Sequence, residues 1–254
     1  MPKLGYLSHL KLSGFRSIKE MDLPLGRLNV LIGPNGAGKS NFINFFRFMN
    51  KLLQKDLQLY VAEQGGADAV LHFGRKQTPL LKVDLTFDPN SYRCELMPTN
   101  DGRLVFKEES GYFDGGKIGY DGGGKVKMLA EPGAIESGLP KPSTDTVAGH
   151  VAHYMDDWKV YHFHDTSKTA LVKQPCEVMD NERLREQGEN LAAFLFDVQE
   201  HQPEAYQRIV TTIQRAAPFF HDFILEPDRH NDSKIRLRWK HKGNDAYFDA
   251  HSLS

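Results

Sequence analysis

The amino-acid sequence predicts an α/β fold with an antiparallel β-meander and a helical lobe. Three observations lead to it. A short apolar run at residues 28–32 is followed by the glycine-rich stretch GPNGAGKS and then by phenylalanines at helical spacing. Residues 80–130 alternate polar and apolar side chains with a period of two, which indicates strands. Residues 181–217 carry apolar side chains at helical spacing, which indicates helices.

Three strands are expected before residue 33. The first is indicated by alternating apolar positions, which are Leu10, Leu12 and Phe15. The second covers residues 21–25. The run at 28–32 is nearly continuous in apolar side chains, which is typical of a strand buried on both faces.

A helix is expected over residues 39–53. Its apolar side chains form one stripe of Phe42, Phe46, Met49 and Leu53, widened by Phe45, Phe48 and Leu52. A helix with so many apolar residues must be buried, and we expect it to pack against the sheet.

The later part of the chain alternates between loops and regular elements. Residues 111–124 are dense in glycine and predict a mobile hairpin tip, and residues 131–145 predict a Pro/Gly/Ser linker or loop. Residues 158–163 return to a strand pattern. Pro203 suits a first helical turn and Pro218 ends the helical region. A last pair of strands is expected at 234–241 and 246–250.

Composition narrows the class of protein. The chain has 254 residues, 40% of them apolar, which is enough for one large domain or two lobes with a sizeable core. A formal net charge of −1 argues against a globally basic nucleic-acid surface but leaves room for a local basic patch. Cys94 and Cys176 fit no metal-ligand spacing and are expected to be reduced thiols. No apolar run reaches about 18 residues, and the N-terminus does not resemble a signal peptide. We therefore expect a cytoplasmic protein with no membrane span.

Residues 33–40 fit the phosphate-binding pattern G-x-x-x-x-G-K-[ST]. The glycines let the backbone turn its N–H groups inward, and the following helix adds the partial positive charge of its N-terminus. Lys39 can reach the phosphates, and the hydroxyl of Ser40 can ligate Mg²⁺. A glycine turn without a ligand is disfavoured, because strand, loop, Lys, Ser and helix occur in the required order. The expected cofactors are ATP and Mg²⁺. The residues assigned to nucleotide binding here are Asn35, Gly36, Ala37, Gly38, Lys39, Ser40 and Asn41.

A second stretch also reads G-x-x-x-x-G-K. It begins at Gly119 and ends at Lys125. Val126 offers no hydroxyl to a metal, and no buried strand precedes the stretch. We interpret it as a hairpin tip and not as a phosphate site.

The P-loop resembles that of ABC-type ATPases, and residues 10–46 as a whole resemble the SMC/RecF/OLD class of ABC ATPase heads. In that class a short strand ends in Phe-Arg-Ser about 20 residues before the P-loop, and Phe15, Arg16 and Ser17 stand in that place. The resemblance implies that Arg16 lies beside the nucleotide phosphates. An exposed turn arginine is the alternative. Segments 160–167, 184–195 and 217–223 are similar to stand-alone bacterial ATPases of this class.

The family pattern also requires a signature motif that begins Leu-Ser, a strand that ends in Asp-Glu, and a switch histidine. The sequence ends at Leu253-Ser254, where the signature would begin. Asp197 sits in a helical pattern before Val198, and no acid precedes Glu226. The expectation is therefore the N-terminal part of a longer or shortened ATPase that is active as the intact protein and inactive alone.

This resemblance implies three segments. Residues 1–165 form a nucleotide-binding lobe that contains the P-loop and the meander at 80–130. Residues 166–228 form a helical lobe. Residues 229–254 are returning strands that lead into the missing signature motif.

Two further groups of residues have open interpretations. His162 and His164 lie two apart on an expected strand, where a metal site is conceivable but ordinary surface histidines are favoured. The resemblance places the Q-loop, which senses Mg²⁺ and the γ-phosphate, at His164-Asp165, and Gln77 is a weaker candidate for that role. Neither assignment is secure from the sequence.

A basic strip lies near the C-terminus. Arg236, Arg238 and Lys240 alternate on an expected strand and would share one face. The strip could face DNA, or it could be a solvated edge strand whose charges discourage aggregation. The sequence leaves both readings open.

The favoured function is a nucleotide-driven switch. Two ATPase heads, as a homodimer, would sandwich ATP and act on DNA or with a nuclease or other effector partner, in DNA repair or antiviral phage defence. These partners are implied only by the resemblance. The alternatives are an ABC transporter motor subunit, or a nucleotide-binding module without turnover. A long coiled coil is not expected, since residues 181–217 are too few.

Overall fold

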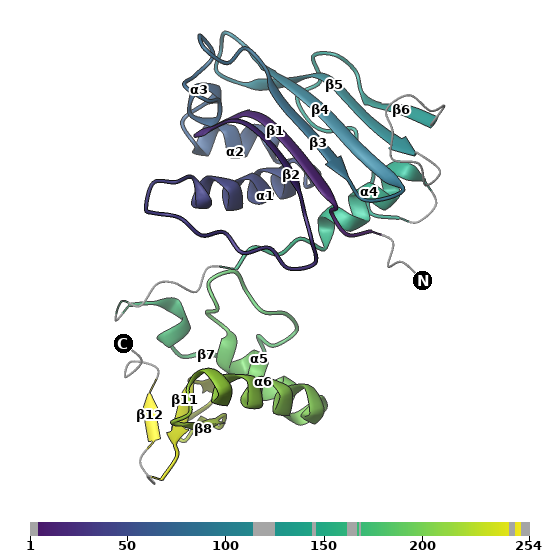
Figure 1. Ribbon diagram of the computed structural model, residues 1–254. Helices are drawn as coiled ribbons and strands as arrows, with labels where there is room; N and C mark the ends of the chain where they lie inside the picture. Colours follow the sequence, from purple (N-terminus) through teal and green to yellow (C-terminus); the bar gives the residue numbers. More distant parts are fainter. Residues whose placement is uncertain are drawn as a thin grey trace. The chain divides into compact units, whose positions relative to one another are not determined.

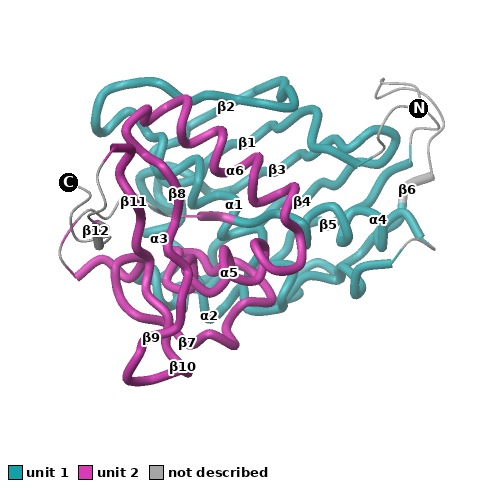
Figure 2. Tube along the Cα trace, turned by 90° about the horizontal axis from the view of Figure 1, so that it is seen from below, with its two compact units in different colours: residues 1–159 teal, residues 160–254 magenta. Residues whose placement is uncertain are grey.

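The computed structural model describes residues 5–113, 125–143, 146–161, 167, 169–243 and 247–249. The chain divides into two compact units, Met1–Lys159 and Val160–Ser254 (Figure 2). Each unit has its own apolar core. The segment expected as a helical lobe, 166–228, and the returning strands at 229–254 belong to the same unit.

Unit 1 is built on a six-stranded sheet in which every neighbouring pair is antiparallel (Figure 1). The strand order is β2-β1-β3-β4-β5-β6. The predicted meander is therefore confirmed, and the first two strands join it through the pairing of β1 with β3. The strands are β1 (His9–Phe15), β2 (Ile18–Pro24), β3 (Leu81–Thr86), β4 (Asn90–Pro98), β5 (Leu104–Phe113) and β6 (Lys125–Ala130).

Helices α1, α2 and α4 lie on the same face of this sheet (Figure 1). The predicted bounds of α1 are confirmed. The other helices described in unit 1 have no counterpart in the sequence analysis, and one of them, α3, is a single short turn. The helices of unit 1 are α1 (Lys39–Leu53), α2 (Leu57–Glu63), α3 (Ala67–Val70) and α4 (Val147–Asp156).

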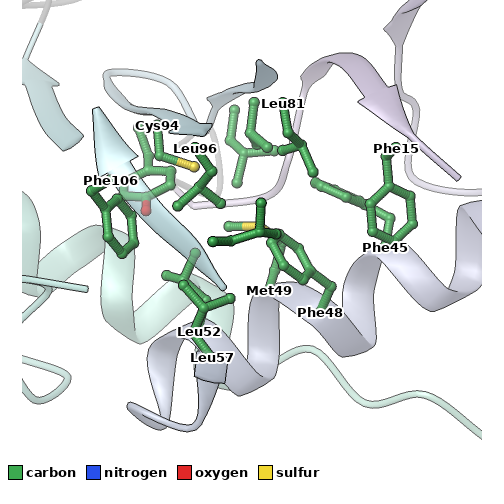
Figure 3. Close-up of a cluster of buried hydrophobic side chains, with 14 of the residues drawn as sticks. Phe15, Phe45, Phe48, Met49, Leu52, Leu57, Leu81, Cys94, Leu96 and Phe106 are labelled. Atoms are coloured by element: carbon green, nitrogen blue, oxygen red, sulfur yellow. The ribbon is translucent and has the colours of Figure 1, made fainter. Parts of the chain in front are cut away.

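The side chains of α1 that enter the core come mainly from one side of the predicted stripe. Phe42, Phe46 and Leu53 are only partly buried. The fully buried positions pack against residues of β1, β3, β4 and β5, among them Phe15 and Phe106 (Figure 3). The buried residues of α1 are Phe45, Phe48, Met49 and Leu52.

The apolar run at 28–32 is not a strand. It lies in an irregular segment that links β2 to α1 (Figure 1), and four of its side chains are exposed by 42–91%. β1 already pairs with β2 on one edge and with β3 on the other, so the run cannot lie beside β1. It does not pair with the outer edge of β2 either, and its residues form no strand. The expectation of a buried strand before the P-loop is therefore wrong for this structure.

The loop that follows β6 is fixed to the rest of unit 1, although its sequence suggested a linker. The carboxylate of Glu136 accepts hydrogen bonds from the N–H groups of Leu57 and Gln58, at 3.0 and 3.1 Å. It thus caps the first turn of α2 from outside the helix. Phe106 N–H also donates to Ala134 O at 2.9 Å.

A buried carboxylate anchors the same loop. Glu109 on β5 has no exposed surface, and its Oε1 accepts from the hydroxyls of Tyr92, at 2.7 Å, and of Ser137. Its Oε2 accepts from Gly138 N–H at 2.6 Å. Burial, followed by the neighbouring Cys94 and Glu109, raises the pKa of the Tyr92 hydroxyl well above its usual value. A buried charge needs such partners, so Glu109 holds the loop to the sheet.

Unit 2 packs two helices against short strands. The helix over Leu191–His201 is mostly apolar, and the helix over Pro203–Ala216 is more amphipathic. Both contribute side chains to the core that contains Phe220, Ile235 and Trp239. The strands form two three-stranded antiparallel sheets, in the orders β7-β10-β9 and β12-β11-β8. The elements are η1 (Leu171–Lys173), β7 (Cys176–Glu177), α5 (Leu191–His201), α6 (Pro203–Ala216), β8 (Phe220–Ile224), β9 (Pro227–Asp228), β10 (Asn231–Ile235), β11 (Arg238–His241) and β12 (Tyr247–Asp249).

The helical region is shorter than predicted. Residues 181–190 are turns and irregular segments, and helix begins only at Leu191. Pro203 does open α6, and α6 ends before Pro218, as expected. Residues 158–161 are not a strand, and the remainder of that predicted strand lies outside the described residues.

The predicted C-terminal strand at 234–241 is divided. Its first part belongs to β10 and its second part to β11, which lie in different sheets, with Arg236 and Leu237 between them. The pairing of the last two predicted strands is confirmed, because β11 pairs with β12. The glycine-dense residues 114–124 lie outside the described residues, but the strands that flank them pair through Phe113 and Lys125.

Candidate phosphate-binding site

The glycine-rich loop leads directly into α1. Within the loop, Ala37 N–H donates to Pro34 O at 3.2 Å, which closes a tight turn. Gly36 and Gly38 have φ angles of 84° and 92°, in the left-handed region that residues with a Cβ avoid. A Cβ at Gly38 would also lie 3.2 Å from Ser17 Oγ. The conformation of the loop therefore depends on these glycines.

Lys39 is the first residue of α1, and its ammonium lies on the loop. It donates to Gly33 O at 2.7 Å and to Pro34 O at 2.8 Å. The carbonyl oxygens of Gly33 and Pro34 thus hold the Lys39 ammonium beside the N-terminal end of α1. A cation in this position can neutralise phosphate oxygens.

The first turn of α1 offers backbone donors. Its first internal hydrogen bond runs from Phe42 N–H to Gly38 O at 3.0 Å. The N–H groups of Lys39, Ser40 and Asn41 precede it and so have no acceptor within the helix. The turn contains no acidic residue. Together with the positive end of the helix dipole, these donors favour an anion.

The turn between β1 and β2 reaches the same place. The side-chain amide of Asn41 donates to Ser17 Oγ at 2.7 Å. Arg16, the preceding residue, has a φ of 49°, and its backbone is held on both sides. Its N–H donates to Val70 O at 2.8 Å, and its carbonyl oxygen accepts from His72 Nδ1 at 2.7 Å. The Phe-Arg-Ser turn therefore lies next to the start of α1.

The guanidinium of Arg16 contacts α2. Its Nη2 donates to the amide oxygen of Gln64 and, at 3.4 Å, to the hydroxyl of Tyr60. Its central carbon lies 5.8 Å from the centre of the Phe15 ring. Burial raises the pKa of Tyr60, and the Arg16 charge opposes that rise. Arg16 Nε is buried without a partner among the described residues. The arginine is thus adjacent to the P-loop helix, with its hydrogen bonds directed to α2.

Of the residues proposed to sense the metal, Gln77 lies within the described residues and the other two do not. His164 and Asp165 lie outside the described residues. Gln77 is exposed on a turn in which its N–H donates to Gly74 O at 3.2 Å. Within the described residues, no three His, Cys, Asp or Glu side chains form a group that could hold a metal ion.

The two acids that the sequence analysis found unsuited to the Asp-Glu strand both lie in unit 2. Asp197 is on α5 and pairs with His201 at 3.0 Å. Glu226 follows β8. Neither is placed relative to the P-loop of unit 1.

Comparison with known proteins gives a family match that covers the loop. Residues 28–112, which include the whole P-loop and α1, match the family described as "AAA domain, putative AbiEii toxin, Type IV TA system". The match supports a P-loop NTPase domain in this part of the chain. A stretch of 37 residues is 46% identical to an OLD nuclease of Thermus scotoductus. That stretch covers 15% of this chain and 7% of the nuclease.

The helices described in this structure include none with both the length and the apolar character that a membrane crossing requires.

Sequence reasoning missed the two side chains that hold Arg16. Tyr60 lies on α2, and Gln64, four residues later, is the residue that directly follows α2, so both lie on the same side of the helix end. A pattern of two hydrogen-bonding side chains at this spacing, soon after the P-loop helix, was available as a signal. It was not used because α2 was not recognised as a helix.

Proposed function

We propose that this chain is the ATP- and Mg²⁺-binding part of an ABC-like ATPase of the SMC/RecF/OLD class, which uses the nucleotide as a switch. The observation that supports the proposal best is the P-loop at the start of α1, with left-handed Gly36 and Gly38 and the Lys39 ammonium on its carbonyl oxygens. The identity shared with an OLD nuclease supports the choice of class.

Each residue of the loop has a role in this proposal. The N–H groups of the loop and of the first turn of α1 hold the phosphate oxygens, and Lys39 neutralises their charge. Ser40 contributes its hydroxyl to Mg²⁺. The metal, when bound, draws charge from the β- and γ-phosphates.

In this proposal, Arg16 is the residue that responds to the bound nucleotide. Its backbone is fixed beside α1, while its guanidinium bonds Tyr60 and Gln64 on α2. When a γ-phosphate is present, the guanidinium exchanges these neutral partners for a charged one, since charge-assisted hydrogen bonds are the stronger kind. The bonds between Arg16 and α2 would then report which nucleotide is bound.

The experiment is calorimetric titration of the chain with ATP, in Mg²⁺ and in EDTA. Lys39→Ala should lower the affinity at least about tenfold, because the site loses the cation that neutralises the phosphates. Lys51→Ala is the matched control, since Lys51 lies on the same helix and pairs with Asp56 at 3.2 Å. Equal affinity of Lys39→Ala and Lys51→Ala would contradict the proposal.

Turnover is tested separately. Transfer of the γ-phosphate to water requires a held metal, an oriented water and stabilisation of the developing charge. Lys39, Ser40 and Arg16 supply part of this set. We expect the 254-residue chain to bind ATP but to release phosphate at only a trace rate. A rate near one per second or faster, which is roughly the low end of ordinary enzymes, lost in Lys39→Ala, would contradict this expectation.

The partners extend the proposal. A second ATPase head as homodimer, DNA, and a nuclease effector in DNA repair or antiviral defence are proposed from the class alone. Sedimentation of the chain with and without ATP tests the first of these. A sedimentation coefficient that does not change with ATP would mean that the nucleotide alone does not join two heads.

A further inference from the structure

Unit 2 contains a pocket that the P-loop does not explain. It has a volume of about 440 Å³ and lies where β8, β9 and β11 meet. Four cationic side chains line it, and they come from two stretches of chain. They are Arg229, Arg236, Arg238 and Lys240. The chain as a whole has a net charge of −1, so this concentration of positive charge is local.

The strand geometry explains how two of these side chains, both on β11, come together. Trp239 is buried in the core of unit 2, where its ring stacks on Phe248 at 4.9 Å. Arg238 and Lys240 flank Trp239 on β11 and therefore point to the opposite face of the sheet. On that face Arg238 lies opposite Ile224 of β8, which also lines the pocket. The basic side chains that alternate with Trp239 on β11 thus form one wall of the pocket.

Arg229 comes from the other side of the pocket. Arg229 lies in the turn between β9 and β10, which Asp228 holds by accepting from His230 N–H at 2.9 Å. Arg238 Nη2 lies 3.5 Å from the carbonyl oxygen of Glu226, so its guanidinium is directed toward β9. The cations therefore converge on one hollow from both of its sides.

We propose that this pocket binds the phosphate backbone of a nucleic acid strand. Three of its four cations are arginines, whose planar guanidinium suits phosphate oxygens. Arg236, Arg238 and Lys240 alternate with the buried Leu237 and Trp239, and the four steps from Arg236 to Lys240 would cover about 13 Å if fully extended. A row of that length is longer than one phosphate group and fits a chain that carries one charge per nucleotide. The proposal concerns unit 2 and does not depend on nucleotide binding at the P-loop.

Two carboxylates restrict how a strand can lie. Glu226 and Asp228 both line the pocket on the β9 side. They repel phosphates, so the backbone is expected to follow the β11 side, along Arg236, Arg238 and Lys240. Glu226→Gln should therefore raise the affinity, because it removes repulsion and leaves the backbone carbonyl that Arg238 contacts.

The test is fluorescence anisotropy of the full 254-residue chain with a labelled 12-nucleotide oligothymidine at several salt concentrations. The triple variant Arg236→Gln, Arg238→Gln, Lys240→Gln should lose at least about tenfold in affinity. Its salt slope should fall by roughly two, from three lost phosphate contacts on a single strand. The matched control removes the same charge elsewhere in unit 2, at the exposed residues Arg208, Arg215 and Lys242, each changed to Gln. This control variant should keep the affinity and the salt slope of the parent.

Three results would overturn the proposal. Equal losses in the triple variant and its control would assign the binding to total charge. Inorganic phosphate that competes as well as the oligonucleotide, at equal phosphate concentration, would assign the pocket to a small anion. Loss of oligonucleotide binding in Lys39→Ala, with ATP absent, would move the site to the P-loop. Retained oligonucleotide binding in Lys39→Ala, together with retained ATP binding in the triple variant, would separate the two sites.

Discussion

The side-chain amide of Asn41 donates to Ser17 Oγ at 2.7 Å, and this bond fastens the β1–β2 turn to the first turn of α1. The turn contains Arg16, and α1 begins with Lys39 and Ser40. Two segments that are 24 residues apart in sequence thus meet beside the P-loop. The predictions on nucleotide binding follow from this arrangement.

The first prediction concerns Arg16 and Gln64. Arg16→Gln should lower ATP affinity by about tenfold, because one charge-assisted phosphate contact is worth roughly 1.5 to 3 kcal/mol. Gln64→Ala should raise ATP affinity slightly, since it removes a neutral partner that competes for the guanidinium. Gln54→Ala, an exposed glutamine just after α1, is the control. Calorimetry in which all three variants equal the parent would place Arg16 away from the phosphates.

The second prediction concerns Ser40. Ser40→Ala should reduce ATP affinity more in Mg²⁺ than in EDTA, because the hydroxyl contacts the metal while the backbone donors remain. Titrations of the parent and the variant in both buffers give the comparison. A loss that is identical in the two buffers would show that Ser40 acts on the loop itself.

The third prediction concerns Gly138. A Cβ at this position would lie 1.6 Å from Leu129 O, so alanine forces the backbone apart. Gly138→Ala should destabilise unit 1 by about 2 kcal/mol or more, since the atoms that the new methyl group would meet belong to the backbone of Leu129 and Ala130. Gly26→Ala, whose nearest contact would be at 3.7 Å, is the control. Urea unfolding measures both, and equal midpoints would contradict the close packing of this loop.

The fourth prediction concerns the cap of α2. Glu136→Ala should cost about 1 kcal/mol, the usual value of an N-terminal cap. The effect should appear as faster amide hydrogen exchange at Leu57 and Gln58, whose N–H groups the carboxylate accepts. Glu131→Ala changes an exposed glutamate of the same loop and should leave these amides unaffected. Unchanged exchange in Glu136→Ala would show that the cap is not populated.

The sequence predicted those elements whose signal is local. The alternation of Leu10, Leu12 and Phe15 defined β1, and the lysine after the glycine loop defined the start of α1. Pro203 marked the start of α6 for the same reason, since a first-turn proline acts on its own backbone.

The elements that depend on distant partners were not predictable in this way. α2 is capped by Glu136, which lies 79 residues from Leu57 in sequence. An apolar run shows that residues 28–32 favour burial, but it does not show whether a neighbouring strand has room for them. α4 is different, because Thr146 caps it by accepting a hydrogen bond from Gly149 N–H. A threonine at this position is a local sequence signal for the start of a helix.

The candidate site was predicted unevenly for the same physical reason. The P-loop is contiguous, so its pattern specifies the backbone of residues 33–40. The direction of the Arg16 guanidinium depends on Tyr60 and Gln64, which only the fold brings near it. The basic row of Arg236, Arg238 and Lys240 was visible in the sequence, but its place in a pocket depends on the break that separates β10 from β11.

The exposed run before the P-loop also governs how the purified chain behaves in solution. Leu28, Val30 and Ile32 are 71–91% exposed, and the window 28–32 contains no charge and no proline. Such windows add to one another as strands, so turbidity and scattering should rise with protein concentration. Val30→Lys should delay this rise as a gatekeeper charge does. The melting temperature should remain unchanged, because Val30 contributes nothing to the core.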